Sequence, residues 1–204
     1  MAERATSLRE RKKQKTRQRI LDTAIELFQD HGFNQTSVDE IASRADVSRA
    51  TCFNYFPNKE SILREIAVQE LEQLQQLAGD ERPDPPVARI RQVMRRLVAD
   101  TLPYLRITRY IILGAMLYPS DENAFNIRLG NILGTLVQEA QRRGEIRSDL
   151  SPTEVAHAIT GIYLAVVFER ITHHDAITDA SSSVERIVDM VFQGLAGPNY
   201  TPLS

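Results

Sequence analysis

Apolar residues recur at helical spacing along almost the whole chain, and this pattern is the strongest constraint on its fold. They fall at i, i+3, i+4 and i+7 in successive segments, which is the repeat of one face of an α-helix. A sustained alternation of apolar and polar residues, typical of a half-buried strand, is absent from the sequence. The sequence therefore predicts an all-α protein.

Capping patterns and helix breakers set the expected helix boundaries. Ser37 to Glu40 has the form of a capping box and predicts a helix from Val38, and Ser48 is the expected N-cap of a helix from Arg49 to about residue 56. The remaining helices are expected at about 16–31, 58–77, 87–102, 104–118, 122–143, 152–171 and 184–195. Two of the predicted helices are thus very short and are separated by about three residues.

The segment from Gly79 to Pro86 holds three prolines and a glycine, the densest cluster of helix breakers in the chain. It predicts a connection between two domains. We expect an N-terminal domain over residues 10–65 and a larger helical domain over residues 66–204, with the boundary within or just after the fourth helix.

Positive charge is concentrated at the N-terminal end. Residues 1–19 carry a net charge of +6, although the whole chain carries −2. A cationic segment of this kind is where an anionic polymer such as DNA would bind. The balanced total charge argues against a DNA binder that ignores sequence, since such proteins make many more phosphate contacts.

Several classes of protein are disfavoured by what the sequence lacks. Cys52 is the single cysteine, so neither a disulfide framework nor a cysteine metal cluster is expected. The longest apolar run, Ala158 to Phe168, is shorter than the ~20 residues of a membrane helix, and no secretion signal is recognised. The four histidines belong to no catalytic motif. We expect a cytoplasmic protein that is not an enzyme, with no cofactor, no bound metal and no membrane partner.

Two short helices after a helix with a basic start match the layout of a helix-turn-helix, although a simple helical hairpin has the same layout. The residues are more specific. Residues 36–63, TSVDEIASRADVSRATCFNYFPNKESIL, closely resemble the signature of the tetracycline-repressor (TetR) family, and with His31-Gly32-Phe33 the resemblance covers about residues 10–65. It implies a three-helix DNA-binding domain followed by a helical-bundle domain for ligand binding and dimerisation. It also implies a palindromic DNA operator, a homodimer, a small-molecule effector and, by default, repression.

Geometry and the resemblance together suggest how DNA would be contacted. Arg49 is the best candidate for reading guanine, Asn54 is a second base reader, and Ala50 is small enough to touch a thymine methyl group. Tyr55 and Lys59 match family positions that contact phosphate. The full expected set is Thr36, Ser37, Ser48, Arg49, Ala50, Thr51, Phe53, Asn54, Tyr55 and Lys59.

Three positions depart from the family pattern. Asp46 replaces a usual glycine in the turn, and aspartate tolerates left-handed geometry better than most residues. Phe53 replaces a common tyrosine and loses a phosphate contact, and Cys52 replaces a leucine as a small core residue rather than a redox switch. The core between the two short helices is expected to comprise Val38, Ile41, Ala42, Val47, Cys52 and Phe56.

The predicted helix over 152–171 is apolar on more sides than one core contact requires, so one face should pack within the subunit and another across a dimer interface. The candidate interface residues are Ile162, Val166, Ile187 and Val191. The candidate effector-pocket residues are Met94, Leu97, Tyr104, Tyr110, Met116, Phe125 and Tyr163, because ligand pockets are mostly apolar with a few polar tips.

A metal-sensing regulator remains an alternative, because Glu169 and His173 fall one helical turn apart with His174 and Asp175 beside them. A polar helix end, with histidines facing the negative end of its dipole, explains the same residues. A nucleoid-like protein that binds DNA without regard to sequence is the other alternative.

Overall fold

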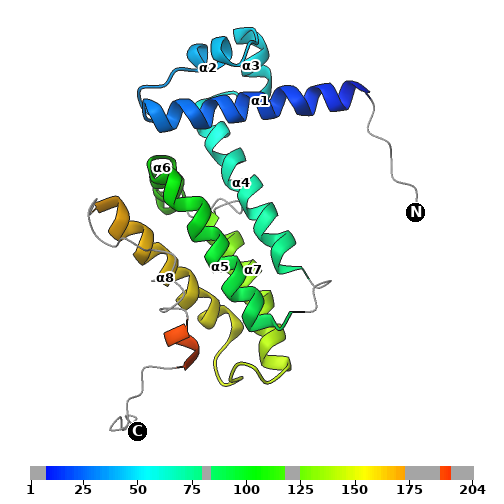
Figure 1. The fold of residues 1–204 in the computed structure, drawn as a ribbon, viewed down its shortest axis with the longest axis vertical. Helices are drawn as coiled ribbons and strands as arrows, with labels where there is room; N and C mark the ends of the chain where they lie inside the picture. Colours follow the sequence, from blue (N-terminus) through cyan, green and yellow to red (C-terminus); the bar gives the residue numbers. More distant parts are fainter. Residues whose placement is uncertain (1–7, 80–83, 118–124, 173–188, 194–204) are drawn as a thin grey trace. The chain divides into compact units, whose positions relative to one another are not determined.

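The computed structural model describes residues 8–79, 84–117, 125–172 and 189–193. All regular secondary structure in these ranges is helical, which confirms the predicted all-α class (Figure 1). The helices are α1 (Leu8–Asp30), α2 (Val38–Arg44), α3 (Arg49–Tyr55), α4 (Lys59–Ala78), α5 (Pro86–Thr101), the 3-10 turn η1 (Leu102–Tyr104), α6 (Leu105–Leu117), α7 (Phe125–Arg142) and α8 (Pro152–Thr172). Residues 189–193, part of the predicted last helix, are also helical.

Helix α1 begins at Leu8, eight residues before the predicted start at residue 16. Its first turns contain no buried residue, and the earliest buried position is Ile20. Hydrophobic periodicity therefore gave no signal there. The added segment is rich in Arg, Lys, Glu and Gln, which have high helix propensity, so the helix extends without a core to pack against.

The predicted capping boxes form to different extents. At the start of α8 the box is complete, because the Glu154 amide donates to Ser151 Oγ at 3.2 Å and the Ser151 amide donates to Glu154 Oε2 at 2.8 Å. At the start of α2 only one arm forms: the Glu40 amide donates to Ser37 Oγ at 3.1 Å, whereas the Glu40 carboxylate contacts His31. One satisfied amide is sufficient to begin a helix.

The chain divides into two structural units. The first contains residues 1–69 together with 106–114 of α6, and the second contains residues 70–105 and 115–204. Helix α4 is continuous, and its residues are shared between the two units. No pattern in the sequence indicates that a segment of α6 belongs with the N-terminal helices.

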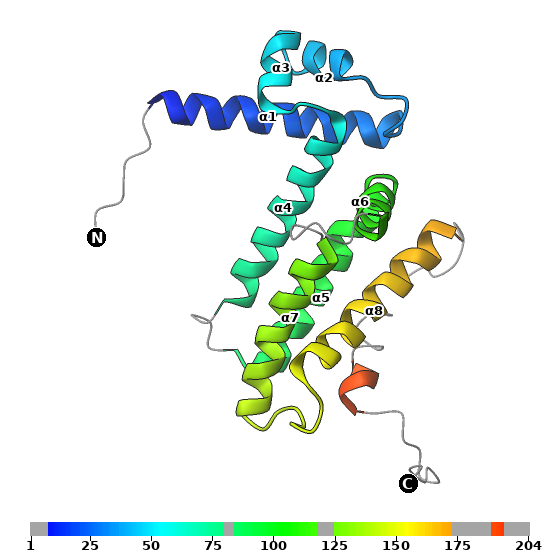
Figure 2. The same ribbon diagram turned by 180° about the vertical axis from the view of Figure 1, so that it is seen from behind.

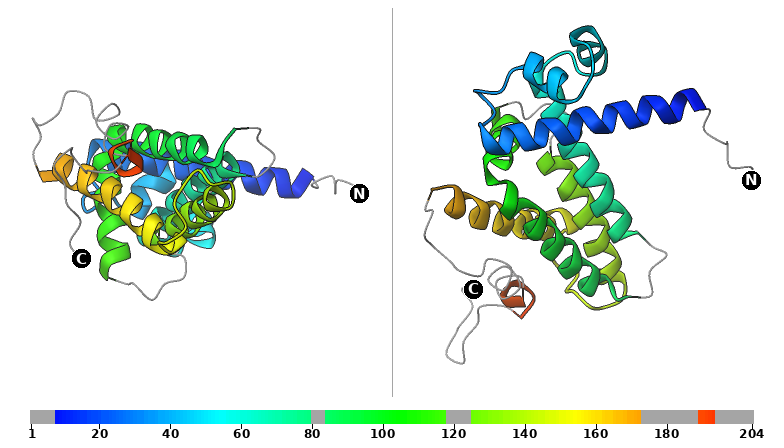
Figure 3. Two further views of the ribbon diagram at one scale, coloured as in Figure 1. Left: turned by 90° about the horizontal axis from the view of Figure 1, so that it is seen from below. Right: turned by 45° about the horizontal axis from the view of Figure 1, so that its top comes forward.

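The first unit has one apolar core, to which α1, α2, α3, α4 and α6 all contribute (Figure 3, right). Phe33, in the α1–α2 connection, packs its ring edge against Phe28 and lies 4.8 Å from the ring of Tyr110 on α6. Ile107 of α6 is buried in the same core. Arg106 donates to the carbonyls of Gln29 and Asp30 at the end of α1, where positive charge is favourable.

The second unit is built on α5, α7 and α8, which pack side by side (Figures 1 and 2). Helix α8 is long and apolar enough to cross a membrane by composition alone. Ile159, Tyr163 and Val167 of this helix are buried within the unit. The Tyr163 hydroxyl makes a 3.0 Å hydrogen bond with Thr101 Oγ1, and burial raises the pKa of Tyr163 to about 12.

A buried ion pair joins three elements of this unit. The Arg89 side chain on α5 is only 1% exposed and pairs with Glu139 of α7. Arg89 Nη1 also donates to the carbonyls of Ala78 and Gly79, each at 3.0 Å. Because these carbonyls have no partner within α4, Arg89 caps the end of that helix and neutralises Glu139 at the same time.

A second polar group on α4 lies in a less favourable environment. Burial, reinforced by the nearby Asp100 carboxylate and opposed by Arg96, raises the pKa of Glu70 from 4.5 to about 7. Its Oε1 atom is buried and has no hydrogen-bond partner among the described residues. Tyr163, on α8, adds a neutral phenol nearby.

We expect Glu70→Gln to stabilise the protein at high pH. The folded state binds the Glu70 proton more tightly than the unfolded chain does. Protonation of Glu70 therefore contributes fully to the free energy of unfolding below about pH 4.5, and this stabilisation is lost as the pH rises to about 7. Urea unfolding should give the variant a gain of about 1 kcal/mol at pH 8, reduced by partial solvent screening, and little gain at pH 4.5. Exposed Glu72→Gln on the same helix is the control, and an equal gain at both pH values would contradict the assignment.

Candidate nucleic-acid interface and effector site

Two serine caps position the helices of the predicted DNA-binding motif. Ser37 caps α2, and Ser48 Oγ accepts the Thr51 amide of α3 at 3.1 Å. The Ser48 and Thr51 hydroxyls also lie 2.8 Å apart. These hydroxyls therefore have local partners, and any phosphate contact by them would be made at the helix N-termini that they define.

The turn between α2 and α3 adopts the conformation predicted for it. Asp46 has φ of 51°, in the left-handed region where a glycine would normally be favoured. Arg19 of α1 donates to the Asp46 carbonyl at 3.2 Å, and the Val47 amide donates to the Ala42 carbonyl at 3.0 Å. The aspartate is therefore accommodated, as the sequence predicted.

The predicted core between the short helices is present. Ile41, Ala42, Cys52 and Phe56 are at most 3% exposed. The other two predicted members, Val38 and Val47, are partly buried and pack against the same cluster. Burial, with a smaller contribution from Asp39, raises the pKa of the Cys52 thiol, which agrees with a packing role.

The opposite face of α3 is exposed and carries the predicted base readers. Arg49, Ala50, Phe53 and Asn54 all lie on this surface. The Arg49 guanidinium lies 5.5 Å from the centre of the Phe53 ring, and its Nε is 2.9 Å from Asp39 Oδ1 of α2. The side chain is thus held between an aromatic face and a carboxylate while remaining 69% exposed.

Two members of the predicted DNA-contacting set face the interior. Thr36 is 1% exposed, and its hydroxyl donates to the carbonyls of Gly32 and Leu27. Its side chain thus stabilises the α1–α2 connection, and its predicted DNA contact stays a prediction. Lys59 Nζ donates to the carbonyls of Phe33 and Thr36 at 2.7 and 2.8 Å and lies over the Phe33 ring.

Lys59 consequently ties the start of α4 to the α1–α2 connection, and its predicted phosphate contact stays a prediction. Tyr55, the other predicted phosphate contact, is partly buried against the core of the first unit. Beside it, Arg17 lies 4.8 Å from the centre of the Phe56 ring and pairs with Glu65 of α4, which raises the pKa of Arg17.

The predicted contact set omitted the basic residues at the start of α1. They are exposed, and they are helical rather than part of an unstructured arm. This group comprises Arg9, Arg11, Lys12, Lys13 and Lys15. The concentration of charge in residues 1–19 was the available signal, but their helical arrangement left no trace in hydrophobic periodicity.

Comparison with known proteins agrees with this geometry. The family model "Bacterial regulatory proteins, tetR family" matches residues 20–66, from the buried part of α1 to the first turns of α4. The chain belongs to the TetR family. It is 25% identical over 184 residues to the HTH-type transcriptional repressor KstR of Rhodococcus jostii, covering 86% of this chain and 82% of that protein.

Relatives of the TetR family also match the chain beyond the DNA-binding motif. The HTH-type transcriptional regulator LuxR of Vibrio harveyi is 23% identical, covering 87% of this chain and 89% of its own. The structure of Thermus thermophilus FadR, a TetR-family repressor in complex with lauroyl-CoA, is 25% identical with a TM-score of 0.66, covering 92% of this chain and 99% of that one. The protein is thus a non-enzymatic DNA-binding transcriptional regulator of the TetR fold.

The predicted effector-pocket residues do not form one group. Met94, Leu97, Phe125 and Tyr163 are buried in the second unit, where the rings of Phe125 and Tyr163 lie 6.3 Å apart. Tyr104 is 42% exposed in η1. Tyr110 instead packs in the core of the first unit, and Met116 lies in α6 at a position whose side chain is outside the described part.

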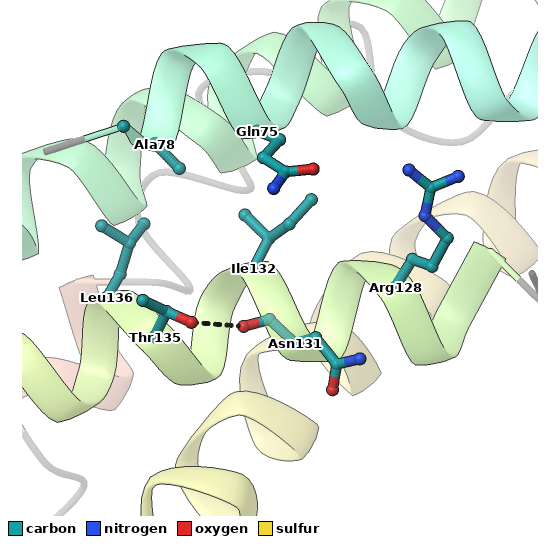
Figure 4. A pocket seen from close by; sticks show the side chains of 8 residues that line it. Gln75, Ala78, Arg128, Asn131, Ile132, Thr135 and Leu136 are labelled. Atoms are coloured by element: carbon teal, nitrogen blue, oxygen red, sulfur yellow. Dashed lines mark hydrogen bonds between the residues drawn. The ribbon is translucent and has the colours of Figure 1, made fainter. Parts of the chain in front are cut away.

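A cavity of about 390 Å³ lies between the last turns of α4 and helix α7 (Figure 4). None of the seven predicted pocket residues lines it. This α4–α7 cavity is lined by Gln75, Ala78, Gly79, Arg128, Asn131, Ile132, Thr135 and Leu136. The predicted residues were chosen because they are apolar, and such residues occupy core positions, whereas the cavity is bordered by partly polar helix faces. A ligand contact by the predicted residues stays a prediction.

The predicted dimer-interface residues also divide. Val166 is 4% exposed and packs within the subunit, and its predicted place in an interface stays a prediction. Ile162 and Val191 are partly exposed, and Ile187 lies outside the described residues. The same holds for His173, His174 and Asp175 of the alternative metal site; among the described residues, no group of three metal-ligating side chains occurs.

Removal of the Lys59 ammonium should destabilise the protein without DNA. We expect Lys59→Met to lower the free energy of unfolding by about 1 to 3 kcal/mol, because the carbonyls of Phe33 and Thr36 in the α1–α2 connection lose a charged donor. Chemical denaturation followed by circular dichroism measures this loss. Lys15→Met, on the exposed start of α1, should leave stability nearly unchanged; equal stability of the two variants would indicate that Lys59 acts on phosphate alone.

Proposed function

We propose that this TetR-family protein is a cytoplasmic repressor that binds a palindromic DNA operator as a homodimer and is released by a small-molecule effector. The observation that carries the proposal is the exposed face of α3, whose opposite face is fixed in the core by Cys52 and Phe56. A recognition helix must have one rigid face and one free face to enter the major groove. The proposed domains remain residues 10–65 for DNA binding and 66–204 for regulation and dimerisation.

In this proposal the side chains of α3 divide into two roles. Arg49 pairs with the acceptors of a guanine, after exchanging Asp39 for the base, while the Phe53 ring supports its guanidinium plane. Asn54 and Ala50 contact neighbouring bases. Tyr55, the N-termini of α2 and α3, and the basic start of α1 bind phosphates and set the register of the motif on DNA.

Residues 106–114 of α6 supply a route by which an effector would act on the DNA-binding motif. Arg106 binds carbonyls at the end of α1, and Tyr110 packs on Phe33, which in turn contacts Lys59. A movement of α6 would therefore alter contacts at the junction of α1, α2 and α4. An effector shifts the equilibrium only if it binds one arrangement of these contacts better than the other.

The homodimer is proposed to form through the exposed face of α8. Ala158, Gly161 and Ala165 are exposed along this helix, and Phe168 beyond them is 67% exposed. Small residues allow a second helix to approach closely, and an exposed phenylalanine in line with them would be buried by the same contact. A second copy of the chain is the occupant that a palindromic operator requires.

Phe168→Glu should weaken the dimer. Placing a carboxylate in an apolar interface should raise the dimer dissociation constant at least tenfold, or about 1.4 kcal/mol, measured by analytical ultracentrifugation. Leu150→Glu is the matched control, because Leu150 is also a large, exposed hydrophobic residue. It is 44% exposed and lies in the connection before α8. A dimer unaffected by Phe168→Glu would place the interface elsewhere.

Selection of random duplex DNA against the full chain tests the proposed function. The expected result is a selected palindromic sequence that the protein binds far more tightly than bulk DNA at two salt concentrations. An affinity that depends on salt alone, without enrichment, would favour a DNA binder that ignores sequence.

With the selected operator, Arg49→Ala should cost about 1 to 3 kcal/mol and relax specificity at one base pair. Tyr55→Phe should weaken binding to all operator variants similarly, because a phosphate contact carries no sequence information. Fluorescence anisotropy over single-base variants measures both. Equal losses at every variant for Arg49→Ala would refute its role as a base reader.

A further inference from the structure

The α4–α7 cavity has a chemical character of its own. Its volume of about 390 Å³ is within the range of roughly 300–1,000 Å³ typical of small-molecule sites. Ala78, Ile132 and Leu136 supply apolar surface, while Gln75 supplies an amide. Figure 4 shows Arg128 extending from α7 towards α4 and Gln75 extending from α4 towards α7. The lining is therefore apolar at one end and polar, with a cation, at the other.

The cation in this cavity has no partner in the described part of the chain. No carboxylate lines the cavity, and the Arg128 guanidinium makes no ion pair or hydrogen bond with a described residue. Other arginines of the second unit are paired: Arg89 with Glu139, Arg91 with Asp189, Arg96 with Asp100. Arg128 is also only partly exposed, so its charge is incompletely hydrated.

The remaining polar groups of the lining are either acceptors that already accept a hydrogen bond or side chains that can donate one. The carbonyls of Ala78 and Gly79 accept from Arg89, and the Thr135 hydroxyl donates to the Asn131 carbonyl at 3.1 Å. The side-chain amide of Gln75 makes no hydrogen bond with a described residue, which leaves its NH₂ group able to donate. The Arg128 guanidinium and the Gln75 amide are the donors that extend into the space between α4 and α7 (Figure 4), and a guanidinium is the group best suited to a carboxylate or phosphate.

We propose that the α4–α7 cavity binds an anionic amphipathic small molecule. Its carboxylate or phosphate is held by Arg128 and the amide of Gln75, and its apolar part lies against Ile132, Leu136 and Ala78. The regulatory consequence rests on the proposed function: an occupant changes the packing of the last turns of α4, whose first turns belong to the DNA-binding unit. Binding itself does not depend on that function.

Calorimetric titration of the full chain with decanoate, decyl phosphate, decan-1-ol and decylamine tests the proposal. All four share one apolar chain, so differences report the head group. At least one of the two anions should bind at least tenfold more tightly than the alcohol, and decylamine should bind more weakly still; the stronger anion distinguishes carboxylate from phosphate. Arg128→Gln should abolish the preference for the anion, Arg128→Lys should retain part of it, and Arg142→Gln, an exposed arginine later on α7, should have no effect.

The proposal is overturned if the alcohol binds as tightly as the anions, if Arg128→Gln keeps their preference, or if neither anion binds below about 1 mM. Circular dichroism verifies that Arg128→Gln is folded, and Arg128→Lys serves as the second variant if it is not. Release of the selected operator is measured separately. Anion binding without release removes the effector role and keeps the site, whereas failure to select any operator removes the proposed function and leaves the calorimetric result standing.

Discussion

The exposed face of α3, which carries the candidate base readers, depends on two seven-residue helices, α2 and α3, that are too short to be stable by themselves. Isolated helices of this length do not form in water, because the entropic cost of nucleation exceeds the favourable free energy of a few hydrogen bonds. Helices α2 and α3 exist because Ser37 and Ser48 satisfy their first amides and because Ile41, Cys52 and Phe56 bury their inner faces. The exposed face that carries Arg49 is the consequence of that burial.

A cation holds each end of α4. At the first turn, Lys59 binds the carbonyls of the α1–α2 connection, and at the last turn the buried Arg89 binds those of Ala78 and Gly79. Unpaired carbonyls at the C-terminal end of a helix attract positive charge, so Arg89 acts as a cap of α4, whereas Lys59 ties the first residue of α4 to the α1–α2 connection. The same helix thus has a defined beginning in one unit and a defined end in the other.

The local elements of the fold followed well from the sequence. The caps at Ser37, Ser48 and Ser151, the left-handed Asp46 and the core around Cys52 were all expected, because each depends on neighbours a few residues away. Side chains whose partners are far apart in sequence were not foreseen. Thr36 and Lys59 belong to a motif that suggested DNA contacts, yet their polar atoms are directed to backbone carbonyls. Similarly, periodicity could not tell that Val166 is buried within the subunit while Phe168 is exposed.

By itself, the sequence determined the helical class, the boundaries of the short helices, the cationic start of the chain and the family of the DNA-binding motif. These features depend on local residue spacing, on capping side chains and on charge, which act over one or two helical turns. Only the tertiary structure decided that residues 106–114 of α6 join the DNA-binding unit, that Arg89 is buried with Glu139, and that Arg128 lines a cavity without an ion-pair partner among the described residues. Those outcomes depend on which helix faces meet, and a single chain's periodicity specifies that a face is apolar without specifying its partner.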